Sequence, residues 1–60
     1  MKPSEHAAMA FHEAFERLGP SFGRDTVPVS WAALPPNWRR LMVATVEHLV
    51  SAGVINLGGA

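Results

Sequence analysis

The chain has 60 residues, of which 48% are hydrophobic, and its five basic residues balance its five acidic ones. This composition is too apolar for intrinsic disorder, and a net charge of zero does not favour binding to nucleic acid or anionic lipid. The absence of cysteine excludes disulfides and thiolate metal sites. We therefore expect one small domain over residues 1–60, with a core of marginal size.

The first predicted helix covers about residues 5–18. Ser4 precedes it and is expected to be its N-cap, because a serine hydroxyl can accept a hydrogen bond from a free main-chain N–H. Phe11, Phe15 and Leu18 recur at i, i+4 and i+7 and predict one apolar stripe, with Ala7, Ala8 and Ala14 beside them. Gly19-Pro20 is a typical helix stop.

Residues 19–35 are expected to form an ordered connector. After Gly19, prolines and glycines interrupt regular structure there at positions 20, 23, 28 and 35. The segment is nevertheless too apolar for a flexible linker, and connectors of this length usually pack on the domain or carry a function. We expect Val27-Pro28-Val29 to be extended and Ser30 to cap a short turn over residues 31–33.

The second predicted helix covers about residues 36–52, and residues 53–60 form a short tail that frays at 58–60. Gly53 should end the helix in a Schellman motif, with Val54 returning to Leu49. The helix has two apolar faces. One face carries Trp38, Leu41, Met42, Thr45, Leu49 and Ala52, and the adjacent valine face carries Val43, Val46 and Val50.

These elements predict an all-α fold, a two-helix hairpin with a long ordered connector that contains tryptophan and proline. One partner helix and a connector can cover only part of a helix that is apolar on two faces. We therefore expect a two-fold homodimer with the valine face at its interface. The alternative is a monomer in which the connector and the tail cover both faces.

The sequence carries no recognisable catalytic, cofactor or metal site. His12 and Glu16 stand at i, i+4, and His48 is a possible third ligand, but the second histidine of the zinc-protease motif is absent. The simpler interpretation is a surface histidine bonded to Glu16. No serine has a nucleophile motif, and no carboxylates are paired for acid–base chemistry. We expect no enzyme, no cofactor and no metal.

The candidate interaction surface combines the valine face with Trp31, Arg39 and Arg40. Tryptophan often anchors interfaces; Trp38, at the start of the second helix, is interpreted as core, whereas Trp31 is either core or a binding anchor. The arginine pair either faces solvent or meets an acidic partner. Two helices separated by about 16 residues do not match a DNA-binding helix-turn-helix. The apolar region 41–55 contains Glu47 and His48 and is too short to span a membrane.

The order of His12-Glu13, Gly23, Trp31, Pro35, Trp38 and Ala44 resembles the first half of the ryanodine-receptor-type repeat domain, which occurs in small bacteriophage and prophage proteins. Residues 20–23 and 40–44 are also similar to short uncharacterised reading frames of actinobacterial phages. The resemblance covers about residues 9–50. It implies a phage or prophage accessory protein without catalytic residues, and it assigns no site residue.

The expected function is that of a non-enzymatic phage-type accessory protein in the cytoplasm of a bacterial host, where it binds a host or viral protein. Surplus apolar surface without chemistry is the reason for this expectation. Two alternatives stay open. One is a structural component of the virion or of its assembly, and the other is an oligomer that binds a small ligand or nucleotide between subunits at Trp31, Arg39 and Arg40.

Overall fold

The computed structural model describes residues 1–57, and within them all regular structure is helical. The helices α1 (Pro3–Leu18) and α2 (Pro36–Ser51) are joined by a connector with two short 3-10 turns, η1 (Gly19–Phe22) and η2 (Trp31–Ala33). This confirms the predicted all-α fold of two helices and an intervening connector. The fraying predicted for residues 58–60 falls outside the described residues.

Helix α1 begins two residues earlier than predicted. Lys2 is its extended N-cap residue and Pro3 occupies the first helical position, where proline lacks only an N–H that has no partner inside the helix. The main-chain N–H of Lys2 donates to the Glu5 carboxylate at 3.5 Å. The prediction of Ser4 as N-cap is therefore wrong. Ser4 lies inside the helix, and its hydroxyl donates to Glu47 of α2 at 2.8 Å.

The end of α1 at Leu18 agrees with the prediction from Gly19-Pro20. The chain tightens into η1 and then turns at Gly23, whose φ of 87° is the left-handed conformation that glycine adopts without steric cost. The main-chain N–H of Arg24 donates to the Gly19 carbonyl at 3.0 Å and closes the turn. The connector then leaves α1 in a new direction.

Helix α2 begins at Pro36 and ends at Ser51, one residue before the predicted end. The predicted Schellman motif is confirmed. Val54 N–H donates to the Leu49 carbonyl at 2.9 Å, and Gly53 N–H donates to the Val50 carbonyl at 3.0 Å. Gly53 has a φ of 76°, again left-handed. The turn at 31–33 is confirmed as well, although Ser30 supports it through its carbonyl, which accepts from Ala33 N–H at 3.1 Å, and not through its side chain.

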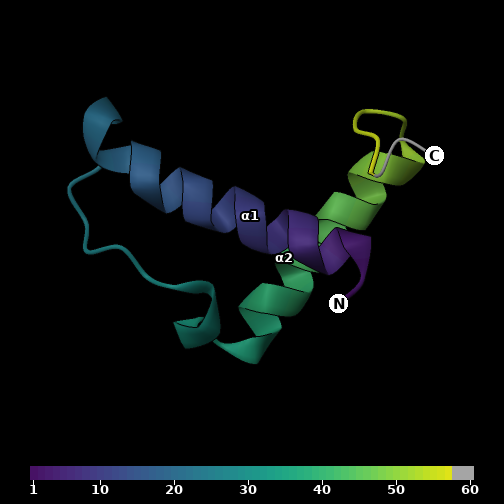
Figure 1. The fold of residues 1–60 in the computed structure, drawn as a ribbon, viewed down its shortest axis with the longest axis horizontal. Coiled ribbons are helices and arrows are strands. Elements are labelled where there is room, and N and C mark those ends of the chain that lie inside the picture. Colours follow the sequence, from purple (N-terminus) through teal and green to yellow (C-terminus); the bar gives the residue numbers. More distant parts are fainter. Residues whose placement is uncertain (58–60) are drawn as a thin grey trace.

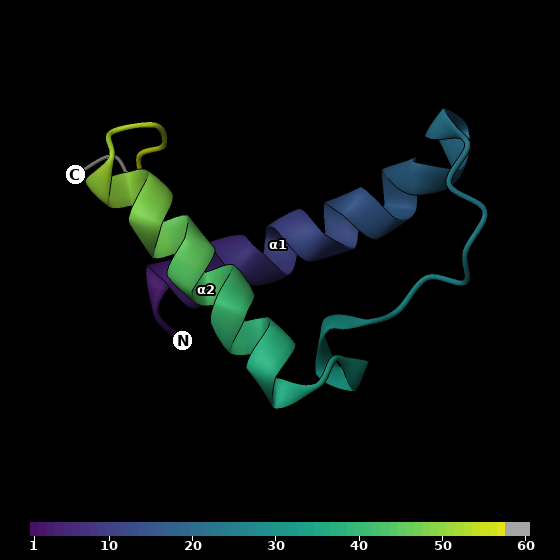
Figure 2. The ribbon, with the colours of Figure 1, turned by 180° about the vertical axis from the view of Figure 1, so that it is seen from behind.

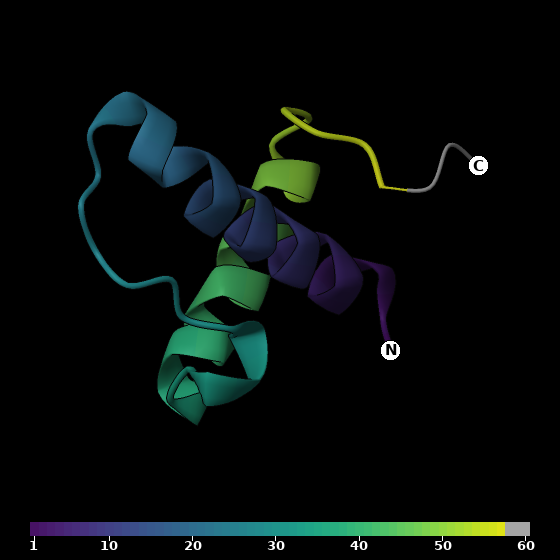
Figure 3. The same ribbon diagram turned by 60° about the vertical axis from the view of Figure 1, so that its left-hand side comes forward.

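The two helices cross where the first half of α1 meets the middle of α2, as Figures 1 and 2 show from opposite sides. The second half of α1 extends away from α2. From its far end the connector returns in a wide arc to the start of α2, which Figure 3 shows from a third direction. The small residues Ser4 and Ala8 are both buried on α1, which suits a close crossing because the separation of packed helices depends on the side chains between them.

The buried face of α1 is not the predicted one. Its buried residues follow a spacing of four, and three of them are polar: Ser4, Ala8, His12 and Glu16. Of the predicted apolar stripe, Ala8 is buried, whereas Phe11, Phe15 and Leu18 are exposed. Ala8 is the buried hydrophobic residue of the described chain, and no large side chain within residues 1–57 is fully enclosed. Polar contacts with the connector and with α2 have taken the place of an apolar core.

Candidate functional site

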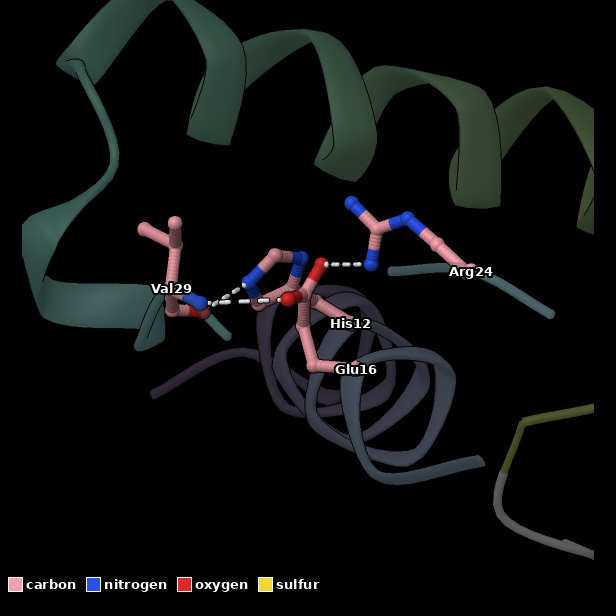
Figure 4. A network of polar contacts seen from close by, with 4 residues as sticks. All are labelled: His12, Glu16, Arg24 and Val29. Carbon is pink, nitrogen blue, oxygen red and sulfur yellow. Dashed lines mark hydrogen bonds and ion pairs between the residues drawn. The ribbon is translucent and has the colours of Figure 1, made fainter. Parts of the chain in front are cut away.

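His12 and Glu16 hold the connector against α1 through the main chain of Val29 (Figure 4). His12 Nε2 donates to the Val29 carbonyl at 2.6 Å, and the Val29 N–H donates to Glu16 Oε2 at 3.1 Å. Both side chains are buried. We call His12, Glu16 and the main chain of Val29 the clamp. The predicted placement of His12 and Glu16 on one side of the helix is correct, but the expected surface position of His12 and its bond to Glu16 are wrong.

Arg24 completes the polar network around Glu16. One of its guanidinium nitrogens lies 2.7 Å from Glu16 Oε1, and the guanidinium carbon lies 5.0 Å from the centre of the Phe15 ring. A cation over an aromatic face is attracted by the ring quadrupole. The hydrogen bond from Arg24 and the hydrogen bond from Val29 N–H lower the pKa of Glu16 below its ordinary value, because both favour the ionised carboxylate.

An apolar groove of about 540 Å³ lies beside the clamp, between the second half of α1, the connector and α2. Phe11 and Phe15 form one wall, with ring centres 6.2 Å apart and nearly parallel planes. Trp38 and Leu41 contribute to the opposite wall on α2. We call these four residues the groove face.

The groove face is open to solvent. Phe11 is 69% exposed, Phe15 51%, Trp38 56% and Leu41 58%. Buried large side chains normally supply most of the stability of a small domain, at about 1.5–3 kcal/mol each. Four such side chains left exposed in one groove form the kind of contiguous apolar patch that marks an interaction surface.

The two faces of α2 are used differently from the prediction. Trp38 was expected in the core but lies on the groove face, more than half exposed. Val43 and Val46, expected at a dimer interface, are half-buried, and Val50 is 38% exposed. Val46 lines the groove, whereas Val43 borders a second hollow. The predicted valine face is therefore divided between two sides of the molecule.

The other candidate residues gather at that second hollow, which measures about 320 Å³. It is lined by Trp31, Arg39, Arg40 and Val43 together with residues at the start of both helices. Trp31 is half-buried and its ring centre lies 6.2 Å from that of His12. Arg39 donates to the Leu34 carbonyl at 2.7 Å and to the Ala32 carbonyl at 3.2 Å. Arg40 is exposed and bonds to the side chain of Asn37.

Arg39 thus fastens the end of the connector to the start of α2, and its guanidinium is engaged within the chain. The structure places Trp31, Arg39 and Arg40 at this hollow, and the sequence did not predict the groove face. The i, i+4 spacing of Phe11 and Phe15 was visible, yet this spacing is shared by a core stripe and by an exposed binding ridge. The distinguishing signal was the parallel spacing of Ser4, Ala8, His12 and Glu16, which competes for the buried side of the same helix.

His12 and Glu16 are not part of a metal-binding cluster. Within residues 1–57 no group of three or more histidine, aspartate or glutamate side chains is close enough to hold an ion. His12 is hydrogen-bonded to the Val29 carbonyl, and Glu16 accepts a hydrogen bond from Arg24. Every buried side-chain nitrogen or oxygen in the described chain has a hydrogen-bond partner.

Comparison with known proteins adds no relative. No family model matches the chain, no curated protein matches it, and no solved structure matches its fold. Neither α1 nor α2, nor any other helix within residues 1–57, has the length and apolar character needed to cross a membrane.

Proposed function

We propose that this chain is a small, non-enzymatic accessory protein that acts by binding another protein through its groove. The observation that carries the proposal is the groove face, on which Phe11, Phe15, Trp38 and Leu41 are all more than half exposed. Tryptophan and other aromatic residues provide much of the binding energy of protein interfaces. An apolar groove between two helices suits the apolar side of a partner helix.

The buried titratable groups support a binding role over a catalytic one. A general acid or base must reach the substrate with a free polar atom. His12 Nε2 is occupied by the Val29 carbonyl, and both oxygens of Glu16 are occupied by Val29 and Arg24. These side chains therefore serve to position the connector, which forms one border of the groove.

The resemblance to phage and prophage proteins suggests where the partner is found. In that setting the protein acts in the cytoplasm of a bacterial host and binds a host or viral protein. A virion or assembly component would use the same apolar groove against its neighbours, and mass spectrometry of purified particles separates the two roles. The small-ligand alternative has less support, because Arg39 at the second hollow is already bonded to Ala32 and Leu34.

A photocrosslinking experiment tests the proposal. A photoreactive benzoylphenylalanine replaces Phe11 in the groove, and the control carries the same group in place of Phe22, which is exposed outside the groove. The chain is expressed in bacterial cells and irradiated. We expect a discrete protein adduct from position 11 and none from position 22. Equal labelling at the two positions, or no protein adduct at position 11, would refute the proposed function.

A further inference from the structure

The isolated chain exposes more surface than a folded monomer of its mass. Its accessible surface is 4658 Å², several hundred Å² more than the roughly 3,800 Å² expected for a folded protein of 6.5 kDa. Its radius of gyration is 12.5 Å, against about 10 Å for a compact domain of this length. The excess is of the order of the surface, about 800 Å², that each partner contributes to a standard interface.

Part of the exposed apolar surface is gathered at the groove face, where four large side chains are each more than half exposed. Ala8 is the buried hydrophobic residue within residues 1–57, so the described chain has almost no apolar core of its own. Hydrogen bonds such as those of the clamp add little net stability, because each one replaces hydrogen bonds to water. A chain in this state needs a covering partner in order to stay folded, not only in order to act.

We infer that the partner covering the groove is a second copy of this chain, related by a two-fold axis. The inference rests on the proposed function and names the partner of the same groove. A cover required for folding must be present wherever the chain is made, and another copy meets that condition. The assembly has a core that neither copy has alone, as in obligate homodimers, whose interfaces resemble a domain core cut in half.

The groove face is suited to an isologous contact. Its two walls come from different helices, Phe11 and Phe15 from α1 and Trp38 and Leu41 from α2. A two-fold axis at the groove gives each copy the same arrangement, in which the α1 aromatic residues of one copy can reach α2 of the other. The formal net charge of zero sets no electrostatic barrier between identical chains.

This arrangement moves the dimer interface away from the valine face expected from the sequence. Val43 and Val46 are already half-buried within one chain. The second hollow, with Trp31 and Arg40 at its border, lies outside the groove and stays on the dimer surface.

Sedimentation equilibrium and thermal unfolding of the full chain test the inference. We expect a mass twice the 6.5 kDa of the chain at micromolar concentration. We also expect a Tm that rises with protein concentration, because unfolding and dissociation are coupled in an obligate dimer. A monomeric mass at tens of micromolar, a larger assembly, or a Tm independent of concentration would each overturn it.

A pair of matched substitutions locates the interface. Phe11→Lys removes a groove phenylalanine that is 69% exposed, and Phe22→Lys removes a phenylalanine outside the groove that is 85% exposed. Both changes should be tolerated in a monomer. In the groove dimer, only Phe11→Lys raises the dissociation constant, by at least about thirtyfold for a residue at the centre of an interface. If the dimer persists unchanged with Phe11→Lys, the groove is not its interface.

The results separate the inference from the proposed function. A concentration-independent monomer that still crosslinks another protein at position 11 keeps the groove as a docking site and rejects the second copy as its occupant. A protein that forms no adduct at position 11 rejects both. If Phe11→Lys does not fold at all, the concentration dependence of Tm in the unchanged protein still decides between monomer and dimer.

Discussion

The hydroxyl of Ser4 donates a 2.8 Å hydrogen bond to the carboxylate of Glu47, and this contact joins the first turn of α1 to the second half of α2. The two residues are 43 positions apart in the sequence. Ser4 has the sequence position of a local helix cap, but it makes a long-range contact between the two helices. The two roles can be distinguished by experiment.

Ser4→Asp is expected to destabilise the fold. Aspartate is as good an N-cap as serine, so the change would be neutral if Ser4 capped α1. Beside Glu47 it instead brings two carboxylates together and removes the hydrogen-bond donor. We expect a loss of about 1–2 kcal/mol in urea unfolding at neutral pH. Adding Glu47→Gln should restore a large part of it, and a double-mutant cycle without coupling would contradict the contact.

Acid should destabilise the protein through Glu16. Its pKa is lowered in the folded chain by Arg24 and by Val29 N–H, so the unfolded chain binds this proton first as the pH falls. The stabilisation by ionised Glu16 is complete above its ordinary pKa of 4.5. It is lost as the pH falls through the lower pKa that Glu16 has in the folded chain. Glu16→Gln should reduce the acid dependence of Tm below pH 5. The exposed Glu13→Gln is the matched control and should retain it.

His12→Ala should weaken the clamp. It removes the Nε2 donor of a buried side chain and leaves the Val29 carbonyl without that partner. Losing one partner of such a bond costs about 1–3 kcal/mol, measurable as a lower urea midpoint at fixed protein concentration. His6→Ala, on the exposed side of the same helix, should stay within about 0.5 kcal/mol of the unchanged protein. Equal effects of the two substitutions would argue against the clamp.

Gly53→Ala should destabilise the end of α2. Gly53 has a φ of 76°, in the left-handed region. An alanine in this backbone conformation costs about 1–2 kcal/mol. No atom lies close to the position that the Cβ would take, so the cost is conformational and not a clash. Gly53→Asn should be milder because asparagine tolerates this conformation. Thermal unfolding should therefore rank glycine above asparagine and asparagine above alanine.

The ends of the helices could be predicted because local chemistry decides them. Gly19-Pro20 stops α1 at Leu18, and Gly53 with Val54 closes α2, and neither signal depends on distant contacts. The turn at Trp31–Ala33 follows the same logic. The all-α class follows from these local signals and from the helical periodicity of the two longer segments.

The faces of the helices could not be predicted in the same way. Hydrophobic periodicity ranks Phe11 and Phe15 above His12 and Glu16 for burial. The connector overturns that ranking, because its main chain at Val29 must be hydrogen-bonded and the side chains of His12 and Glu16 are the groups that reach it. Where a connector of this length lies is a tertiary property. Unless the position of the connector is known, the exposure of Trp38 and of the groove face cannot be predicted either.

The clamp touches Val29 only through the main chain in its hydrogen bonds. The amide and carbonyl it uses are common to nearly every amino acid, so position 29 can change widely during evolution while the connector keeps its place. Proline is the exception, since it has no N–H to offer Glu16. Distant relatives would then share a histidine and a glutamate four residues apart on the first helix. The sequence of the connector that these side chains hold would differ between them. Their homology would be easier to detect from these hydrogen bonds in a structure than from a sequence alignment.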